Sequence, residues 1–172
     1  MNPSKERRQE DLRRLRALEA QSNGRIRILK VTGTPMRSVE MIMAVPTARD
    51  ASFPQRRLPE VTLRIDLPTD YPYVAPKCLI TSQVWNVNVF SNGTVCMGSK
   101  WMPSHQLTLT IARLWRILSL DPEVINPNSP ANSQALEWWQ NLLQNHPHIL
   151  PTASRLVTEE SVKPKLEWKP IT

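Results

Sequence analysis

Cysteine, glycine and long apolar runs are all scarce in this chain. Its 172 residues include four glycines and only two cysteines, Cys78 and Cys96. Two cysteines cannot build a disulfide framework, and the three histidines show no metal-ligand spacing, so no metal site is expected. No apolar run approaches the ~20 residues that a membrane span needs, and the basic N-terminus lacks the apolar segment of a secretory signal. We therefore expect a cytoplasmic protein that does not contact a membrane.

Acidic residues are also in the minority, with 15 Asp or Glu against 22 Lys or Arg, which gives a net charge of +7. Residues 1–30 hold nine of the basic residues and only four acidic ones. Such a stretch predicts an acidic partner, either a protein face or a nucleic acid, although a solvated helix surface explains the charges equally well. All six tryptophans lie outside this stretch, so base stacking is not supported and nucleic-acid binding is disfavoured.

The apolar residues that are present recur with periods typical of an α+β domain. Residues 5–21 combine strong helix formers with a narrow apolar stripe, which predicts a surface helix that ends at Asn23 and Gly24. Further helices are expected over residues 107–120 and 131–145, and an irregular stretch over residues 85–103. Short apolar or alternating runs predict four strands in an antiparallel meander, within residues 25–33, 38–46, 61–68 and 77–85.

The domain boundary is expected near the end of the last helix. Residues 1–147 then form a single domain, because the patterned segments all fall within it. Residues 148–172 carry weak patterning and further prolines, so we expect an extended or partly disordered tail, with Trp168 as a residue that docks on the domain.

The stretch from Asp70 to Cys96 contains a series of motifs in register. They are Asp-Tyr-Pro-Tyr (70–73), Pro-Lys (76–77), Asn-Val-Asn (86–88) and Gly-Thr-Val-Cys-Met (93–97), followed by Trp-Met-Pro (101–103). Their order and spacing resemble the core of the ubiquitin-conjugating (E2) enzyme family, and the order of helices and strands agrees. Three features depart from the family pattern: Asn86-Val87 replaces a His-Pro pair, the segment after Cys96 is three residues shorter, and Asn126 stands at a position often held by aspartate. We interpret these departures as signs of a divergent branch, with a bacterial ubiquitin-like pathway as the hypothesis.

The resemblance implies an enzyme that carries a ubiquitin-like protein as a thioester on Cys96 and passes it to a lysine amine, without a cofactor. It implies that Asn88 acts as an oxyanion donor or as a brace for the loop, and that Asn126 orients the incoming amine. As an amide, Asn126 cannot serve as a general base. Cys78 lies within a predicted strand and is expected to be a core residue.

The same resemblance implies partners: an activating (E1) enzyme, a ubiquitin-like protein, a protein substrate and, left open, an E3 ligase. The residues implied for the E1 surface are Arg7, Arg8, Arg13 and Arg14. Tyr73 and Pro103 stand where family members contact an E3. The alternative function is a non-catalytic scaffold of the same fold that binds a ubiquitin-like protein or an E1, and Cys96 in its motif argues against it.

Overall fold

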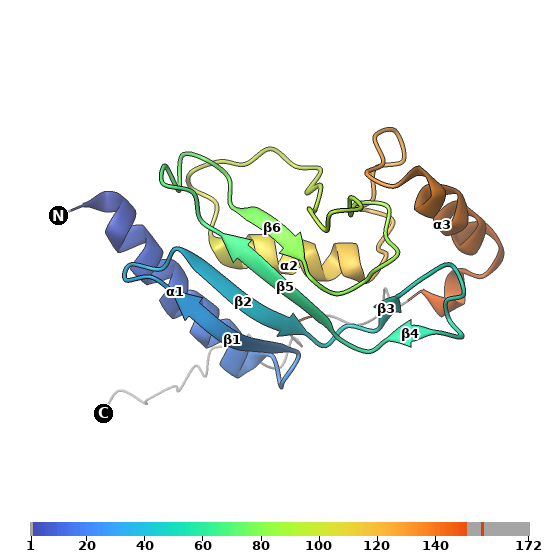
Figure 1. Cartoon of the computed structure of the whole chain (residues 1–172), viewed down its shortest axis with the longest axis horizontal. Helices are drawn as coiled ribbons and strands as arrows, with labels where there is room; N and C mark the ends of the chain where they lie inside the picture. The colour runs from blue at the N-terminus through green and yellow to red at the C-terminus, as the bar shows by residue number, and fades with distance from the viewer. Residues whose placement is uncertain (1, 151–155, 157–172) are drawn as a thin grey trace, which may run out of the picture.

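The computed structural model describes residues 2–150 and residue 156. Figure 1 shows the order of the elements along the chain. The helices are α1 (Pro3–Gln21), α2 (Leu107–Leu118), α3 (Ser133–Asn145) and the short 3-10 helix η1 (Pro147–Ile149). The strands are β1 (Ile26–Thr32), β2 (Ser38–Met43), β3 (Thr47–Ala48), β4 (Arg57–Leu58), β5 (Val61–Asp66) and β6 (Lys77–Ile80).

Four of the strands form one antiparallel sheet in the order β1-β2-β5-β6. The register places Met41 opposite Leu63 and Met43 opposite Val61, and all four side chains are buried. Arg64, which alternates with them on β5, is exposed. One face of the sheet therefore meets the core, as period-two alternation requires. The predicted α+β class and the four-stranded meander are confirmed.

A second, two-stranded ribbon lies in the stretch 47–60, between the second and third of the predicted strands, where the sequence pattern indicates no strand. Strands β3 and β4 pair there, with Thr47 opposite Leu58. Two-residue strands are too short to leave an alternating pattern in the sequence, so periodicity could not reveal them.

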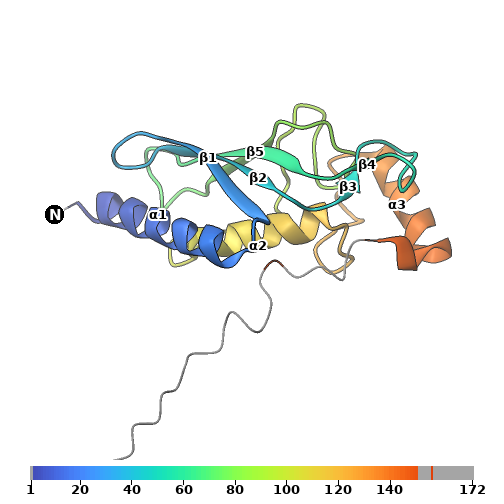
Figure 2. The same ribbon diagram turned by 90° about the horizontal axis from the view of Figure 1, so that it is seen from below.

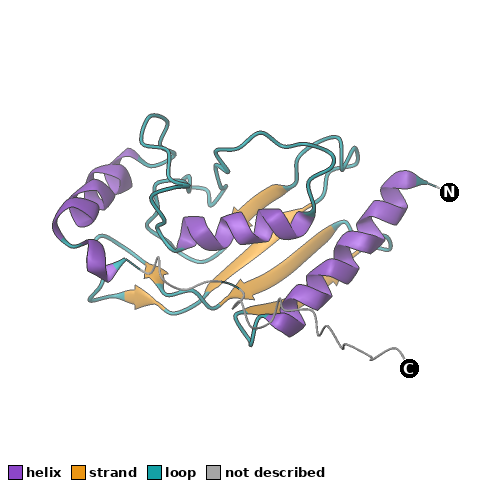
Figure 3. Ribbon diagram, turned by 180° about the vertical axis from the view of Figure 1, so that it is seen from behind, coloured by secondary structure: helices purple, strands orange, loops and turns teal. Residues whose placement is uncertain are grey.

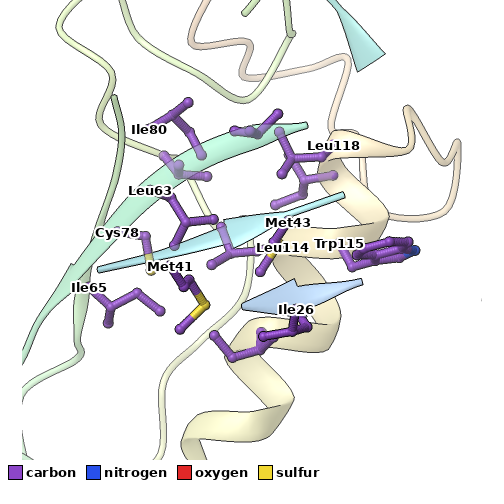
Figure 4. Close-up of a cluster of buried hydrophobic side chains, with 14 of the residues drawn as sticks. Ile26, Met41, Met43, Leu63, Ile65, Cys78, Ile80, Leu114, Trp115 and Leu118 are labelled. Carbon is purple, nitrogen blue, oxygen red and sulfur yellow. The ribbon is translucent and has the colours of Figure 1, made fainter. Parts of the chain in front are cut away.

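Helices α1 and α2 cover the same face of the four-stranded sheet (Figures 2 and 3). Figure 4 shows side chains from β1, β2, β5 and β6 meeting Leu114 and Leu118 of α2. Helix α3 lies at the end of the molecule away from the N-terminus of α1 (Figure 1). Its Trp139 and Leu142 form a second cluster with Phe53 and Leu120.

The ends of the helices follow local signals in the sequence. The side chain of Asn2 accepts a hydrogen bond from the Ser4 N–H at 3.0 Å and caps α1, so the helix begins slightly before the predicted residue 5. Asn23 and Gly24 adopt φ angles of 52° and 78°, so the predicted left-handed end of this helix is confirmed. The side chain of Asn132 caps α3 in the same way as Asn2 caps α1.

Helix η1 crosses the boundary predicted at residue 147. Leu150 beyond it is buried in the second cluster, and Leu156 is buried in the main core, where its carbonyl accepts a hydrogen bond from Arg25. The rest of the predicted tail, including Trp168, lies outside the described residues, so the division at residue 147 stays a prediction. None of the helices in the described part of the chain has the length and apolarity to cross a membrane.

Candidate active site

A short hairpin over residues 89–95 delivers Cys96 to the surface. Val89 and Val95 form a β-bridge, and the Phe90 N–H donates to the Thr94 carbonyl at 2.9 Å. Gly93 closes the turn, with its N–H donating to the Phe90 carbonyl at 2.8 Å and its φ at +86°. Glycine is favoured there because a side chain strains a left-handed backbone.

The hairpin is fixed to the sheet by its second arm. The Val95 N–H donates to the Cys78 carbonyl at 3.0 Å, and the Ile80 N–H donates to the Gly93 carbonyl at 2.8 Å. A Cβ atom on Gly93 would stand only 2.3 Å from the Ile80 carbonyl oxygen. The close approach of the two backbones thus requires glycine for a second reason, besides its φ angle.

The two cysteines occupy opposite environments. Cys96 is partly exposed, and its N–H donates to the Asn88 carbonyl at 2.7 Å. Cys78 is 4% exposed within the main core. Burial, with a smaller contribution from the negative charge of Asp66, raises the pKa of the Cys78 thiol to about 12. Cys78 is therefore a neutral core residue, and Cys96 is the thiol that a partner can reach.

Asn88 holds the backbone on both sides of the cysteine. Its side chain is buried, and the amide nitrogen donates to the Cys96 carbonyl at 3.1 Å and to the Val124 carbonyl at 3.3 Å. Both N–H bonds of the amide are then directed at main-chain oxygens. This geometry supports the brace function among the two roles expected for Asn88, and it ties the loop after α2 to the cysteine loop.

Asn86 is a site residue that the sequence reasoning treated only as a departure from the family pattern. Its buried side chain donates to the Ile117 carbonyl of α2 at 2.8 Å and accepts from the Asn88 N–H at 2.9 Å. Asn86 thereby positions the backbone of Asn88 against the end of the helix. The signal was present, because a polar side chain in a stretch that is otherwise buried needs a partner.

Asn126 lies on the loop that Asn88 anchors. Among the described residues, no hydrogen bond joins Asn126 to Cys96. Its side-chain oxygen accepts from the Asn128 N–H at 3.0 Å, and the residue is exposed. The side chain therefore forms a local turn. The structure thus joins Asn88 to Cys96 directly and places Asn126 two residues from the carbonyl of Val124.

A model of the ubiquitin-conjugating enzyme family matches residues 20–150, most of the chain. The chain belongs to the ubiquitin-conjugating enzyme family. The expected family and fold are thereby confirmed, whereas the expected bacterial branch is not shown.

Individual E2 enzymes resemble the chain more distantly. It is 29% identical over 83 residues to the ubiquitin-conjugating enzyme E2 of African swine fever virus, a match that covers 42% of this chain and 37% of the viral protein. S. cerevisiae Ubc12 superposes with a TM-score of 0.62 at 20% identity, covering 88% of this chain and 77% of Ubc12. The E2 domain of a Toxoplasma gondii ubiquitin-conjugating enzyme superposes with a TM-score of 0.53 at 24% identity. This match covers 84% of this chain and 93% of the Toxoplasma domain. At these identities the two structures show the shared fold alone.

Two of the four arginines expected to bind an E1 are used inside this E2 domain, which corrects the prediction for them. Arg8 is 6% exposed and donates to the carbonyls of Met36 and Pro68 at 3.0 and 2.6 Å. Arg7 pairs with the buried Asp11 at 2.8 Å and donates to the Pro103 carbonyl at 2.6 Å. A guanidinium engaged in this way is not free for a partner. Both arginines instead fasten α1 to neighbouring loops.

Arg13 and Arg14 face outward, in keeping with a role on the surface of this E2 domain. Both pair with Glu10, at 2.7 and 2.8 Å. The hydrogen bond from Arg13 is the largest cause that lowers the pKa of Glu10 to about 2. The family match begins at residue 20, so the four arginines expected to bind an E1 lie outside it and the E1 surface stays a prediction.

Tyr73 and Pro103, the residues expected at an E3 contact, are both exposed, and Tyr73 reaches 76%. Half-buried side-chain donors help to hold both loops in place. Arg7 binds the Pro103 carbonyl, and the Trp101 indole N–H donates to the Pro72 carbonyl at 2.7 Å. Two exposed residues on anchored loops suit a docking surface, and the E3 contact itself stays a prediction.

Proposed function

We propose that the protein accepts a ubiquitin-like protein from an E1 as a thioester on Cys96 and transfers it to a lysine amine of a protein substrate. The observation that carries the proposal is the pairing of Cys96 with Asn88: a reachable thiol on a loop whose backbone is fixed on both sides. An acyl carrier needs a nucleophile that is correctly positioned for two successive partners, and a rigid loop holds the thiol in such a position.

Loading exchanges one thioester for another. The Cys96 thiolate attacks the thioester carbonyl carbon on the E1, the new C–S bond forms, and the E1 cysteine leaves as a thiolate. Because one thiolate replaces another, no strong base is needed beside Cys96, which fits the lack of a histidine bonded to it in the described residues.

Discharge forms an amide. The substrate amine attacks the same carbonyl carbon, the C–S bond breaks with Cys96 leaving as the thiolate, and the amine proton passes to water. Asn88 supports this step by holding the carbonyl of Cys96 in place, and Asn126 borders the path of the incoming lysine as a polar loop residue. The amide of Asn126 cannot take the proton, so Asn126 orients rather than deprotonates.

The partners follow from the surface of the domain. Arg13 and Arg14 would meet an acidic E1 face, whereas Tyr73 and Pro103 would contact an E3. We assign the protein to the cytoplasm, where thiols stay reduced. A bacterial pathway remains a hypothesis that rests on Asn86-Val87 and the shortened loop.

A charging assay tests the proposal. The full chain is incubated with ATP and a panel of E1 enzymes, each with its own ubiquitin-like protein, and read by intact mass spectrometry without reductant. We expect a mass increase equal to one modifier, reversed by added thiol, absent in Cys96→Ala and retained in Cys78→Ala. If the partners bind but Cys96 is never loaded, the non-catalytic scaffold function replaces this one.

A further inference from the structure

A cleft of about 270 Å³ opens beside the cysteine loop, separate from the residues assigned above to partners. Its walls come from the loop before β6, the segment after Cys96 and the first half of α2. Neither Tyr73 nor Pro103 lines it. The residues that matter for its chemistry are Pro76, Met97, Lys100, Trp101, Leu109 and Arg113.

The walls of the cleft are mostly apolar and held in place. Leu109 is 57% exposed although it lies on a helix that is otherwise well packed. The ring of Trp101 is fixed by its indole hydrogen bond to Pro72 and by an edge contact with the His105 ring, 5.8 Å between centroids. Covering a fixed apolar wall that is exposed to water lowers the free energy, because apolar surface is removed from water.

Two positive charges border this apolar wall. Within the part of the chain that the structure describes, no acidic residue lines the cleft and no carboxylate forms an ion pair with Lys100 or Arg113. The Nε of Arg113 donates to the Met97 carbonyl, so this guanidinium is oriented. By contrast, Arg116 one turn further along α2 pairs with Asp121.

We propose that this cleft binds a segment of a partner protein in which one bulky apolar residue is flanked by aspartate or glutamate. The apolar side chain would cover Leu109 and Trp101, and the carboxylates would pair with Lys100 and Arg113. The volume lies below the roughly 300–1,000 Å³ typical of small-molecule sites, which favours a single inserted side chain over a cofactor.

Occupancy of the cleft acts on the cysteine loop. Met97 follows Cys96 directly and lines the cleft, and its carbonyl is held by Arg113. A carboxylate that pairs with Arg113 competes with the Met97 carbonyl for this guanidinium. Pairing therefore alters the hydrogen bond that positions the backbone next to the Cys96 thiol. This consequence rests on the proposed function, whereas binding itself does not.

The test uses three acetylated and amidated pentapeptides and the ¹⁵N-labelled full chain, followed by two-dimensional NMR. The first peptide has leucine flanked on each side by aspartate and glutamate. The second replaces the acids by asparagine and glutamine, and the third replaces the leucine by glycine. We expect saturable shifts for the first peptide alone, at residues 97–101, at residues 105–113 and at the Trp101 indole.

Variants separate a specific site from general charge attraction. Lys100→Gln should lower the affinity for the first peptide a few fold. The double variant Lys100→Gln with Arg113→Gln should lower this affinity about tenfold or more. Lys30→Gln, on β1 and outside the cleft, should bind as the unaltered chain does, and a native-like spectrum of each variant establishes folding. The proposal is overturned if the neutral peptide binds as tightly as the acidic one, or if Lys30→Gln loses as much affinity as Lys100→Gln. It is also overturned if the chemical shifts change mainly outside the cleft, or if no shift changes at peptide concentrations up to about 5 mM. None of these readouts requires an E1, so they fail or succeed independently of thioester loading.

Discussion

The side-chain amide of Asn88 donates to the main-chain carbonyl of Cys96 over 3.1 Å, and its second N–H reaches the Val124 carbonyl over 3.3 Å. Two segments separated along the chain are thus fastened by one buried amide. The relationship explains why an asparagine suits this position: a shorter or acidic side chain cannot donate to both oxygens.

Replacing Asn88 by alanine tests the brace directly. One buried and one partly buried carbonyl lose their donor, so we expect the free energy of unfolding to fall by about 1–3 kcal/mol and thioester loading to slow together with discharge. A residue that acts only as an oxyanion donor would instead leave stability unchanged and slow discharge alone by on the order of 100- to 1000-fold. Urea denaturation and single-turnover assays measure the two quantities, with the exposed Asn141→Ala on α3 as the matched control.

Gly93 and Gly24 provide a matched pair for the hairpin that carries Cys96. Both have positive φ, but an added Cβ meets nothing within 4 Å at Gly24 and stands 2.3 Å from the Ile80 carbonyl oxygen at Gly93. Gly24→Ala should therefore cost roughly 1–2 kcal/mol for the left-handed backbone alone. Gly93→Ala should cost roughly 1–3 kcal/mol more, because the hairpin must shift away from β6. Equal unfolding midpoints in urea would contradict the close approach.

Asp11 links α1 to the start of α2. Its buried carboxylate accepts from Arg7, from the Tyr71 hydroxyl and from the N–H of Leu107. Burial and this carboxylate together raise the pKa of Tyr71. Asp11→Asn leaves the mostly buried Arg7 without its counter-charge, and we expect a loss of about 3 kcal/mol in unfolding free energy. Glu10→Gln, which alters only exposed pairs, should leave the urea midpoint unchanged, and the same shift in both variants would contradict the role of Asp11.

Sequence reasoning reached the sheet and the cysteine more readily than the polar contacts. The alternation over residues 61–68 predicts β5 because burial on one face imposes a period of two. The motif around Cys96 places the thiol on irregular backbone. The partners of Asn88 could not be predicted from the pattern, because they are main-chain oxygens contributed by residues 8 and 36 positions away.

The burial of Arg8 shows the opposite case, where a signal existed. Arg8, Asp11 and Leu15 are the buried residues of α1, at spacings of three and four that place them on one helical face. Charged residues on the apolar stripe indicate buried polar contacts, which here are the main-chain carbonyls bound by Arg8 and the Arg7–Asp11 ion pair. The family resemblance treats four arginines of this segment alike, and so it implied a partner surface for Arg7 and Arg8 as well.

Cys78 predicts how stability changes at alkaline pH. Its pKa is raised from 9.0 to about 12 in the folded state, so the unfolded chain loses the thiol proton first as pH rises. The stabilising contribution is complete below pH 9 and is lost between pH 9 and 12, at up to ~1.4 kcal/mol per pH unit. Urea denaturation from pH 8 to 10 in a Cys96→Ala background should show this slope. Further replacement by Cys78→Ala should remove it, and an unchanged slope would contradict the assignment.

Charge reversal on α1 separates the two pairs of arginines. Arg13 and Arg14 lie on the surface with Glu10, whereas Arg8 is enclosed by the carbonyls of Met36 and Pro68. Arg13→Glu with Arg14→Glu should therefore keep the melting temperature and reduce the rate of E1-dependent loading about tenfold or more, because like charges then face an acidic partner. Loading rates at low and high salt measure the effect, which should shrink as salt screens the charges.

Arg8→Gln is the companion variant, and it should lower stability rather than the rate of loading. It leaves buried carbonyls without their donor, so the urea midpoint should fall while loading of the remaining folded protein, measured well below that midpoint, stays close to normal. If Arg8→Gln slowed loading without loss of stability, the buried arginine would belong to the E1 contact after all. If the double reversal left loading unchanged at low salt, the E1 would have to bind elsewhere than on this face of α1.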